Sequence, residues 1–386
     1  MRHIVTGIDI GTATTRVVIS EYLKGENSPK IIGIGITETK GMKHGYITSI
    51  PDVAQSIKNA MGSAEGHAGV KIKSAYLALG GVGLGSHIGS GVSVISKANT
   101  EVTQFDIEKA IRESEKSGIP QNRTILHSIP FLYKIDGKDI YGRPEGMKGL
   151  KIEVTTLFVT ILDQHINDAI AAVTKTGVRI LDIVAAPLAT SFVALSTKQK
   201  SVGAMLVDFG AETTTISVFE NGSLTGLHVF PYGSNHITND IALGLKVSLE
   251  QAENIKNGDQ PEFTSKRKID EIIDARLLDI FELVQKYLKK MKRHGLLPAG
   301  VCFIGGGSRQ KNIDELAKKI LSLPVRIGGS DGLEDTKTHL RDISLFGAYG
   351  VCLASKILPE PEIDSMKKFF KSIKKLFTQS MGELLP

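Results

Sequence analysis

Two copies of one short motif carry the residues of this sequence that are best suited to chemistry. The pattern Asp-x-Gly-x-x-Thr-Thr follows an apolar run at residues 9–15 and again at residues 208–214, and a β-branched run comes after each copy. This pattern predicts two β-hairpins, each with a carboxylate at the end of its first strand. One copy alone would indicate only a hairpin turn, whereas a matched pair indicates two halves of one site.

The residue types of the paired motif suit a polyphosphate with its metal ion. Glycine allows backbone N–H groups to approach an anion, and the threonines add hydroxyl groups. A carboxylate repels phosphate but binds magnesium, so Asp9 and Asp208 are predicted to hold a hydrated Mg²⁺ between phosphates. The remaining members of this predicted site are Gly11, Thr14 and Thr15 in the first copy, and Gly210, Thr213 and Thr214 in the second.

Composition limits the class of protein. The 386 residues, 41% hydrophobic and 23% charged, predict a soluble protein with more than one domain. Most of the net charge of +6 comes from the last 22 residues, which hold five lysines and one glutamate, so we expect no nucleic-acid groove. Two cysteines indicate reduced thiols in the cytoplasm, and we expect neither a signal peptide nor a membrane-spanning run.

Several segments between and after the hairpins have interpretable patterns. Residues 83–161 differ in residue pattern from the segments around them, and this pattern predicts an inserted α+β unit. The unit is predicted to begin with a Gly/Ser-rich strand pair and to contain a helix capped by Thr103. His127 is more simply a structural histidine than a catalytic one. Glu253 and Lys256 have the spacing of an exposed ion pair on one helix face. Apolar residues at helical spacing from Ile269 to Met291 predict a long amphipathic helix.

A three-glycine turn follows the apolar run before residue 305. Gly305, Gly306 and Gly307 would leave a flat surface against which a purine or ribose could rest, although a glycine turn alone is a weak signal. Ser308 is predicted to cap the helix that comes next.

The C-terminal segment predicts attachment to a membrane surface. Residues 359–364 form a Pro/acid linker, and residues 365–378 follow helical spacing with an aromatic-rich apolar face. Each lysine near an anionic surface contributes about 1 kcal/mol, which favours reversible binding, and a helix docked on a protein partner is the alternative. The apolar face consists of Met366, Phe369, Phe370, Ile373, Leu376 and Phe377, and the basic face of Lys367, Lys368, Lys371, Lys374 and Lys375.

The order of these pieces resembles the actin and heat-shock-chaperone ATPase superfamily, and within it the FtsA family of bacterial cell-division proteins. The resemblance covers essentially the whole chain and rests on ILH-x-IP with IDG, the P-x-GM-x-G-x-x-x-E run at residues 144–153, HIT-x-DIA at residues 236–242, AE-x-x-K, and the lysine-rich end. It implies an α/β, actin-like two-lobed ATPase fold with an α+β insertion in the first lobe.

The resemblance also implies a division of the chain. The first lobe would comprise residues 1–82, 162–198 and 340–358, with the insertion at 83–161. The core of the second lobe would comprise 199–246 and 300–339, with a helical subdomain at 247–299.

ATP and Mg²⁺ are the cofactors that the resemblance implies, in a cleft between the lobes. It adds Thr12 to the phosphate-binding residues of the first hairpin and Glu212 to those of the second, and it places Gly233 at the border of the site. Glu253 and Lys256 would flank the nucleoside, and Gly305 to Ser308 would face the adenosine. Ala186-Pro187 stands where vigorous ATPases of the superfamily have Glu-Pro, which implies slow hydrolysis.

The family's role is to polymerise with itself on the inner face of the cell membrane, bind the FtsZ C-terminal peptide and recruit later division proteins. The FtsZ site would lie on the lobe that carries Arg276 and the long helix. Two alternatives share parts of the pattern. A pilus-assembly scaffold of the PilM type shares the insertion but characteristically lacks the tail. A sugar or acetate kinase shares the hairpins but needs a catalytic aspartate and has no use for the tail.

Overall fold

The computed structural model describes residues 3–357, except 27, 97, 98, 117, 263, 334–339 and 341. The predicted linker at 359–364 and the amphipathic helix at 365–378, with all of its membrane-facing side chains, lie outside the described residues. Among the helices that are described, none is long and apolar enough to cross a bilayer.

The first lobe is built on a five-stranded mixed sheet in the order β11-β6-β1-β2-β3. β1 pairs antiparallel with β2 and parallel with β6, because the first hairpin turns back at once whereas β6 is reached through helix α1. The strands are β1 (His3–Ile10), β2 (Thr14–Tyr22), β3 (Lys30–Glu38), β6 (Ser74–Leu79) and β11 (Arg179–Ala185), and the helices are α1 (Ile50–Ala68), α3 (Asp163–Thr174), α4 (Ala186–Ala194) and α10 (Phe346–Ile357).

The second lobe repeats this topology with a sheet in the order β14-β13-β12-β15-β16. β12 pairs antiparallel with β13 and parallel with β15, as β1 does with β2 and β6. Its strands are β12 (Ala204–Phe209), β13 (Thr214–Glu220), β14 (Ser223–Phe230), β15 (Val301–Ile304) and β16 (Val325–Ile327), and its helices are α5 (Thr197–Val202), α6 (Ser234–Leu245), α7 (Leu249–Lys256), α8 (Lys266–Lys290) and α9 (Ile313–Leu321).

The apolar spacing predicted for a long helix is confirmed by α8. Ile269, Ile273, Leu277, Val284 and Leu288 are buried along one face of the helix and join a core with the strands of the second sheet. A second core joins the first sheet with residues from the other face of the second sheet, so apolar packing continues from one lobe into the other.

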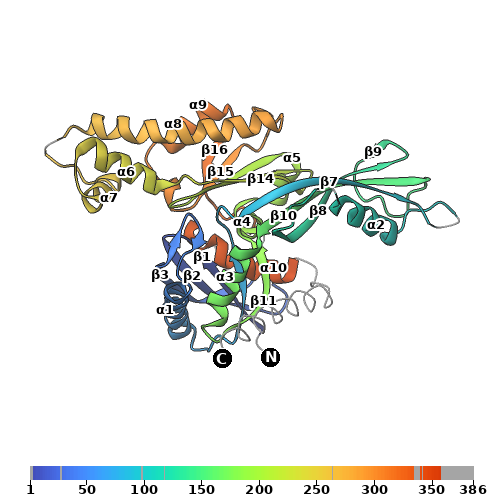
Figure 1. The fold of residues 1–386 in the computed structure, drawn as a ribbon, viewed down its shortest axis with the longest axis horizontal. Helices are drawn as coiled ribbons and strands as arrows, with labels where there is room; N and C mark the ends of the chain where they lie inside the picture. Colours follow the sequence, from blue (N-terminus) through green and yellow to red (C-terminus); the bar gives the residue numbers. More distant parts are fainter. Residues whose placement is uncertain are drawn as a thin grey trace, which may run out of the picture.

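The insertion is an antiparallel sheet in the order β7-β10-β8-β9 with one helix, α2 (Gln104–Glu115), and it projects sideways from the two lobes (Figure 1). Its strands are β7 (Leu84–Val94), β8 (Arg123–Ile135), β9 (Lys138–Ile140) and β10 (Lys151–Leu162). The capping box predicted for α2 is present, because the Thr103 and Asp106 side chains bond reciprocally to the backbone.

The strand pair predicted at the start of the insertion is wrong, because β7 runs as one strand through its glycines. Gly91 lies so close to α2 that a Cβ there would stand 2.1 Å from the carbonyl oxygen of Ala110. These glycines therefore allow a helix to approach the sheet and do not turn the chain.

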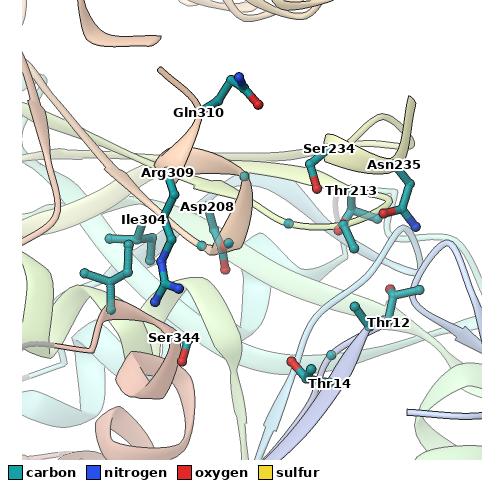
Figure 2. Close-up of a pocket in the computed structure, with 18 of the residues that line it drawn as sticks. Thr12, Thr14, Asp208, Thr213, Ser234, Asn235, Ile304, Arg309, Gln310 and Ser344 are labelled. Carbon is teal, nitrogen blue, oxygen red and sulfur yellow. The ribbon is translucent and has the colours of Figure 1, made fainter. Parts of the chain in front are cut away.

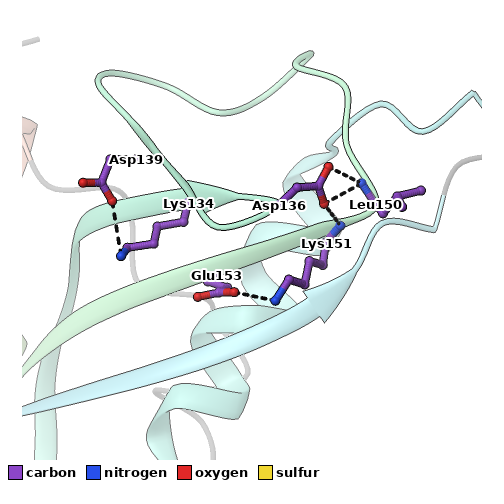
Figure 3. A network of polar contacts seen from close by, with 6 residues as sticks. All are labelled: Lys134, Asp136, Asp139, Leu150, Lys151 and Glu153. Atoms are coloured by element: carbon purple, nitrogen blue, oxygen red, sulfur yellow. Dashed lines mark hydrogen bonds and ion pairs between the residues drawn. The ribbon is translucent and has the colours of Figure 1, made fainter.

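Polar contacts fix the outer end of the insertion (Figure 3). The Asp136 carboxylate accepts hydrogen bonds from the backbone N–H groups of Leu150 and Lys151, each at 3.0 Å. Lys151 pairs with Glu153 at 2.8 Å, and Lys134 pairs with Asp139 at 3.3 Å across β8 and β9. The Asp136 contacts tie the turn between β8 and β9 to the start of β10.

Candidate functional site

The two hairpins of the repeated motif have the same local geometry. In the first, the N–H of Gly11 donates to the carbonyl of Thr14 at 3.1 Å, and in the second the N–H of Gly210 donates to Thr213 at 2.9 Å. Asp9 and Asp208 are each the next-to-last residue of the central strand of their sheet, and they pair with Arg16 and Thr215 respectively. The sequence repeat is therefore a structural repeat.

Both hairpins open into one cleft of about 780 Å³ between the lobes. Thr12 and Thr14 lie on one side, and Asp208 and Thr213 lie on the other (Figure 2). The cleft continues past the N-terminus of α4 to a far end formed by α7, the start of α8 and the glycine turn after β15. A cavity of this shape suits an elongated ligand with an anionic end at the hairpins.

The ionised forms of the two carboxylates at the hairpin end, Asp9 and Asp208, are destabilised by their surroundings. Burial raises the pKa of Asp9, against the opposing effect of Arg16, whose guanidinium lies 3.8 Å from the carboxylate. Burial, and then the charge of Asp9, raise the pKa of Asp208 to about 6. Two carboxylates that repel each other across a cleft form a site to which a cation is attracted.

Each carboxylate rests against a glycine. A Cβ on Gly347, at the start of α10, would stand 2.6 Å from Asp9 Oδ2, and a Cβ on Gly305 would stand 2.4 Å from Asp208 Oδ1. Larger residues at these two positions would displace the carboxylates, so the glycines allow each aspartate to sit at its strand end.

At the far end of the cleft, Glu253 and Lys256 form a partly buried cluster with Thr238. Lys256 Nζ lies 2.7 Å from Glu253 Oε2 and 2.9 Å from Thr238 Oγ1, and Thr238 donates to Glu253 at 2.6 Å. Partial burial acts to raise the pKa of Glu253, but the hydrogen bonds from Lys256 and Thr238 outweigh it and lower that pKa. The cluster fixes α7 to α6 and presents polar side chains to the cleft.

The glycine turn provides a flat wall. Gly305 has φ +84, in the left-handed region, and Gly307 packs against the Phe209 ring, where a Cβ would come within 2.6 Å. At Gly306 a Cβ would meet open space, and all three glycines line the cleft. Side chains are therefore absent where the wall borders the cavity.

Comparison with known proteins identifies the family. The family model described as "Cell division protein FtsA" matches residues 205–350, and the model "SHS2 domain inserted in FTSA" matches residues 82–160. Cell division protein FtsA of Bacillus subtilis strain 168 is 30% identical over 83% of this chain and 77% of its own length. FtsA of Pseudomonas aeruginosa PAO1 is 30% identical over 84% and 82%. This chain belongs to the FtsA family.

Solved structures agree on the actin-like fold that the sequence predicts. The PilM-PilN type IV pilus biogenesis complex matches with a TM-score of 0.69 at 16% identity, over 92% of this chain and 99% of that one. MreB 5 of Spiroplasma citri matches with a TM-score of 0.50 at 15% identity, over 96% and 98%. The α/β two-lobed fold with an insertion is thus confirmed for this FtsA-family cell-division protein.

The structure brings most of the predicted site residues of this FtsA-family chain to the cleft. Those that line it are Asp9, Gly11, Thr12, Thr14, Asp208, Gly210, Thr213, Glu253, Lys256, Gly305, Gly306 and Gly307.

The other predicted site residues lie behind the surface of the cleft. Thr15 bonds to Thr39 at 2.8 Å, and Thr214 donates to the Tyr232 carbonyl at 2.7 Å, so both hydroxyls are engaged in the interior. Gly233 packs against the turn of the second hairpin. The Glu212 carboxylate bonds to His44 of the first lobe.

The prediction that Ser308 caps the following helix is wrong. Ser308 lies within a short 3₁₀ helix, Gly306–Arg309, where its hydroxyl donates to the Gly305 carbonyl, and α9 begins only at Ile313. The left-handed Gly305 starts a tight turn, and the helix begins four residues later than a Ser308 cap would place it.

Several cleft residues were not predicted from the sequence. Arg16, which directly follows the first Thr-Thr, could have been found from its position opposite Asp9 on a predicted hairpin. Gly81, Asn235, Arg309 and Gly347 come from four separate segments, and no local pattern distinguishes them. In Figure 2, Arg309 points towards Ser344, whereas the side chain of Gln310, which also lines the cleft, points in the opposite direction.

Proposed function

We propose that this FtsA-family protein binds ATP with Mg²⁺ in the cleft and uses the bound form to assemble on the cytoplasmic face of the cell membrane. The observation that carries the proposal is the convergence of the Asp9 and Asp208 hairpins on one cavity. MreB 5 of Spiroplasma citri, which has the same fold, is described as bound to AMPPNP. That description supports a nucleotide as the ligand, and the geometry of the cleft supports its orientation.

The residues present fit a magnesium nucleotide. The Arg16 Nε is buried without a hydrogen-bond partner among the described groups, at the end of the cleft where phosphates would lie. The described residues contain no cluster of three His, Cys, Asp or Glu side chains with metal-binding geometry. We therefore expect Asp9 and Asp208 to hold Mg²⁺ through its water shell, with phosphates completing the coordination. The nucleoside would lie between Glu253 and Lys256 on one side and the glycine wall on the other.

The cellular role that we propose is the attachment of FtsZ filaments to the membrane. The chain would polymerise with itself, bind the membrane through residues 365–378, and recruit later division proteins. Family membership supports this role, and so does the amphipathic, lysine-rich pattern of the tail. The pilus scaffold and the kinase remain as alternative functions that the tail and the family membership disfavour.

We place the FtsZ contact on the face of the second lobe formed by α6, α7 and α8. Arg276 on α8 makes two hydrogen bonds with Asp240 on α6, at 2.6 and 2.9 Å, which fixes the helices relative to each other. Leu243 is 78% exposed and Leu249 is 60% exposed on this face. Exposed leucines beside a fixed ion pair suit a short apolar peptide.

Vesicle co-sedimentation tests the membrane part of the proposal. The full chain should pellet with vesicles of equal parts phosphatidylglycerol and phosphatidylcholine, and it should pellet less with phosphatidylcholine alone. A chain truncated after Leu358 should stay in solution with both. A matched variant of full length replaces Lys367, Lys368 and Lys371 by glutamate, which reverses the charge at three positions of the basic face. Equal sedimentation of the full and truncated chains would refute the anchor.

Fluorescence anisotropy with a labelled FtsZ C-terminal peptide tests the partner. Leu243→Asp should weaken binding, because it places a charge on the proposed contact face. Leu23→Asp is the control, since Leu23 is 44% exposed on the first lobe, away from that face. If both variants bind the peptide as well as the parent, the contact lies elsewhere.

A further inference from the structure

One polar contact joins the two lobes beside the hairpin end of the cleft. The backbone N–H of His44, in the first lobe, donates to the Glu212 carboxylate, in the second, at 2.5 Å. The His44 ring nitrogen Nδ1 lies 3.8 Å from the same carboxylate oxygen. We propose that Glu212 is a positioning residue that holds the lobes closed over the hairpin end of the cleft, and that it slows release of the bound nucleotide.

The shape of the first-lobe turn explains why it needs a partner. His44 and Gly45 connect the short strands β4 (Met42–Lys43) and β5 (Tyr46–Ile47), and both residues have positive φ, at +50 and +79. A two-residue hairpin of this kind leaves an N–H of the turn pointing outward. The Glu212 carboxylate satisfies that donor, and a hydrogen bond to an ionised acceptor is stronger than one between neutral groups.

The turn also shapes the cleft. Gly45 lines the cavity and packs on Gly81, which lines it too; a Cβ on Gly45 would stand 2.4 Å from Gly81 Cα. On the other side, Ala211 and Thr213, the neighbours of Glu212, line the cavity from the second lobe. The contact therefore joins two segments that each border the hairpin end.

Each partner of the contact is fixed within its own lobe. The second hairpin accepts hydrogen bonds from the start of α6, where Ser234 donates to Gly210 at 2.9 Å and Asn235 donates to Ala211 at 2.7 Å. The His44 turn is held by the antiparallel pairing of β4 with β5 and by His165, which bonds to the Gly45 backbone. Loss of the Glu212 carboxylate should therefore loosen the lobes at the hairpin end of the cleft without unfolding either turn.

Comparison of the two hairpins shows that the carboxylate is not required by the turn itself. The position of Glu212 in the second copy corresponds to Ala13 in the first, and both turns close with the same glycine-to-threonine hydrogen bond. Glu212 can thus be replaced by alanine in a turn that already accepts alanine at that position. Its side chain serves the contact between lobes and not the local fold.

Pulsed EPR on the full chain tests the contact without any nucleotide. Spin labels on Lys58→Cys in α1 and Glu282→Cys in α8 report the distance between lobes, and the chain's own two cysteines are buried. Glu212→Ala should broaden the distance distribution and shift it to longer values. The matched control, Glu315→Ala on the exposed side of α9, should leave it unchanged. A distribution for Glu212→Ala that superimposes on that of the parent would overturn the proposal.

Release of fluorescent N-methylanthraniloyl-ATP with Mg²⁺ provides the second readout, and this readout rests on the proposed nucleotide function. Glu212→Ala should speed dissociation about tenfold, consistent with loss of one hydrogen bond to a charged group, and Glu212→Gln should be intermediate. An unchanged thermal midpoint excludes misfolding. If the parent binds no nucleotide, the proposed function fails while the EPR result still decides the contact. If the parent binds nucleotide and Glu212→Ala releases it at the same rate as the parent, the proposed role of Glu212 in slowing release is overturned.

Discussion

Asp208 lies close enough to Asp9, across the cleft, for the charge of Asp9 to raise its pKa. Burial makes the larger contribution, and together the two effects place the pKa of Asp208 at about 6. The two carboxylates come from equivalent strand ends of two lobes with the same topology. The molecule therefore brings together like charges that folding alone does not stabilise, which is consistent with a site shaped for a cation.

Removal of the Asp208 charge should stabilise the magnesium-free protein. The pKa of Asp208 is raised on folding, so its ionisation costs stability as pH rises from about 4 through 6, and the full cost remains at pH 7. Asp208→Asn should raise the free energy of unfolding by about 3 kcal/mol at pH 7.5 and by less than about 1 kcal/mol near pH 4. Urea unfolding at both pH values measures this effect.

The matched control for that measurement is Asp139→Asn, which removes an exposed carboxylate from an ion pair with Lys134. Such pairs contribute about 0–1 kcal/mol, so this variant should change stability little at either pH. If Asp208→Asn is less stable than the parent at pH 7.5 without magnesium, the account of charge repulsion is wrong.

A side chain at Gly306 should block the nucleoside end of the cleft. A Cβ there would meet no atom within 4 Å, and the backbone lacks the positive φ that would make a substitution strained. Gly306→Val should therefore fold but weaken binding of fluorescent ATP at least about tenfold, as filling a preformed pocket would. Isothermal titration calorimetry with ATP and Mg²⁺ provides an independent affinity.

Gly62→Val is the control for that substitution, because Gly62 also faces open space but lies on the outer side of α1. It should leave the affinity for ATP unchanged. Equal affinity of Gly306→Val and the parent would show that the glycine wall does not contact the ligand.

Hydrolysis of ATP should be slow. Ala186 and Pro187 line the cleft at the start of α4, and neither side chain can orient an attacking water as a carboxylate can. We expect turnover on the order of 10⁻³ s⁻¹, the range of a phosphate-binding site without such assistance. A coupled phosphate-release assay measures it. Brisk hydrolysis by the parent that Asp208→Ala abolishes would contradict this expectation.

The parts of the fold and site that the sequence predicts are those encoded by short-range patterns. The Asp-x-Gly repeat predicts two hairpins because alternation, turn residues and carboxylate positions all lie within a few residues of one another. Thr103 predicts the start of α2 for the same reason, and the apolar spacing from Ile269 onward predicts α8. Convergence of the hairpins follows from the duplicated topology, which the repeat itself indicates.

The parts that the sequence does not predict depend on distant partners or on backbone angles. Glu212 lies within the second motif, but its hydrogen bond with His44, which is 168 residues away in the sequence, could not be predicted from the motif. Ser308 precedes a helix-forming segment, but the left-handed Gly305 redirects the chain first. Glycine is common in turns, but Gly91 lies within a strand and allows α2 to pack closely against the sheet. Each case depends on a contact that single-sequence patterns do not contain.

Two histidines, the buried His165 and the partly buried His127, should make the protein less stable in mild acid. Burial lowers the pKa of His127 to about 4 and also lowers the pKa of His165 to about 4, against a smaller opposing effect of the Gly45 backbone. His127 Nε2 accepts a hydrogen bond from the N–H of Ala185 at 3.0 Å, which requires the neutral ring. Because both pKa values fall on folding, the stability that these rings contribute is complete above pH 6.5 and is lost as pH falls towards 4.

His127→Gln tests this dependence, since glutamine retains an acceptor but does not titrate. Between pH 7 and pH 4.5 the parent should lose about 2 kcal/mol more unfolding free energy than His127→Gln. Asp208 acts in the opposite direction over the same range, so the Asp208→Asn background isolates the histidine effect. His67→Gln, at an exposed position on α1, should follow the parent. Parallel pH profiles for His127→Gln and the parent would show that His127 does not titrate on unfolding.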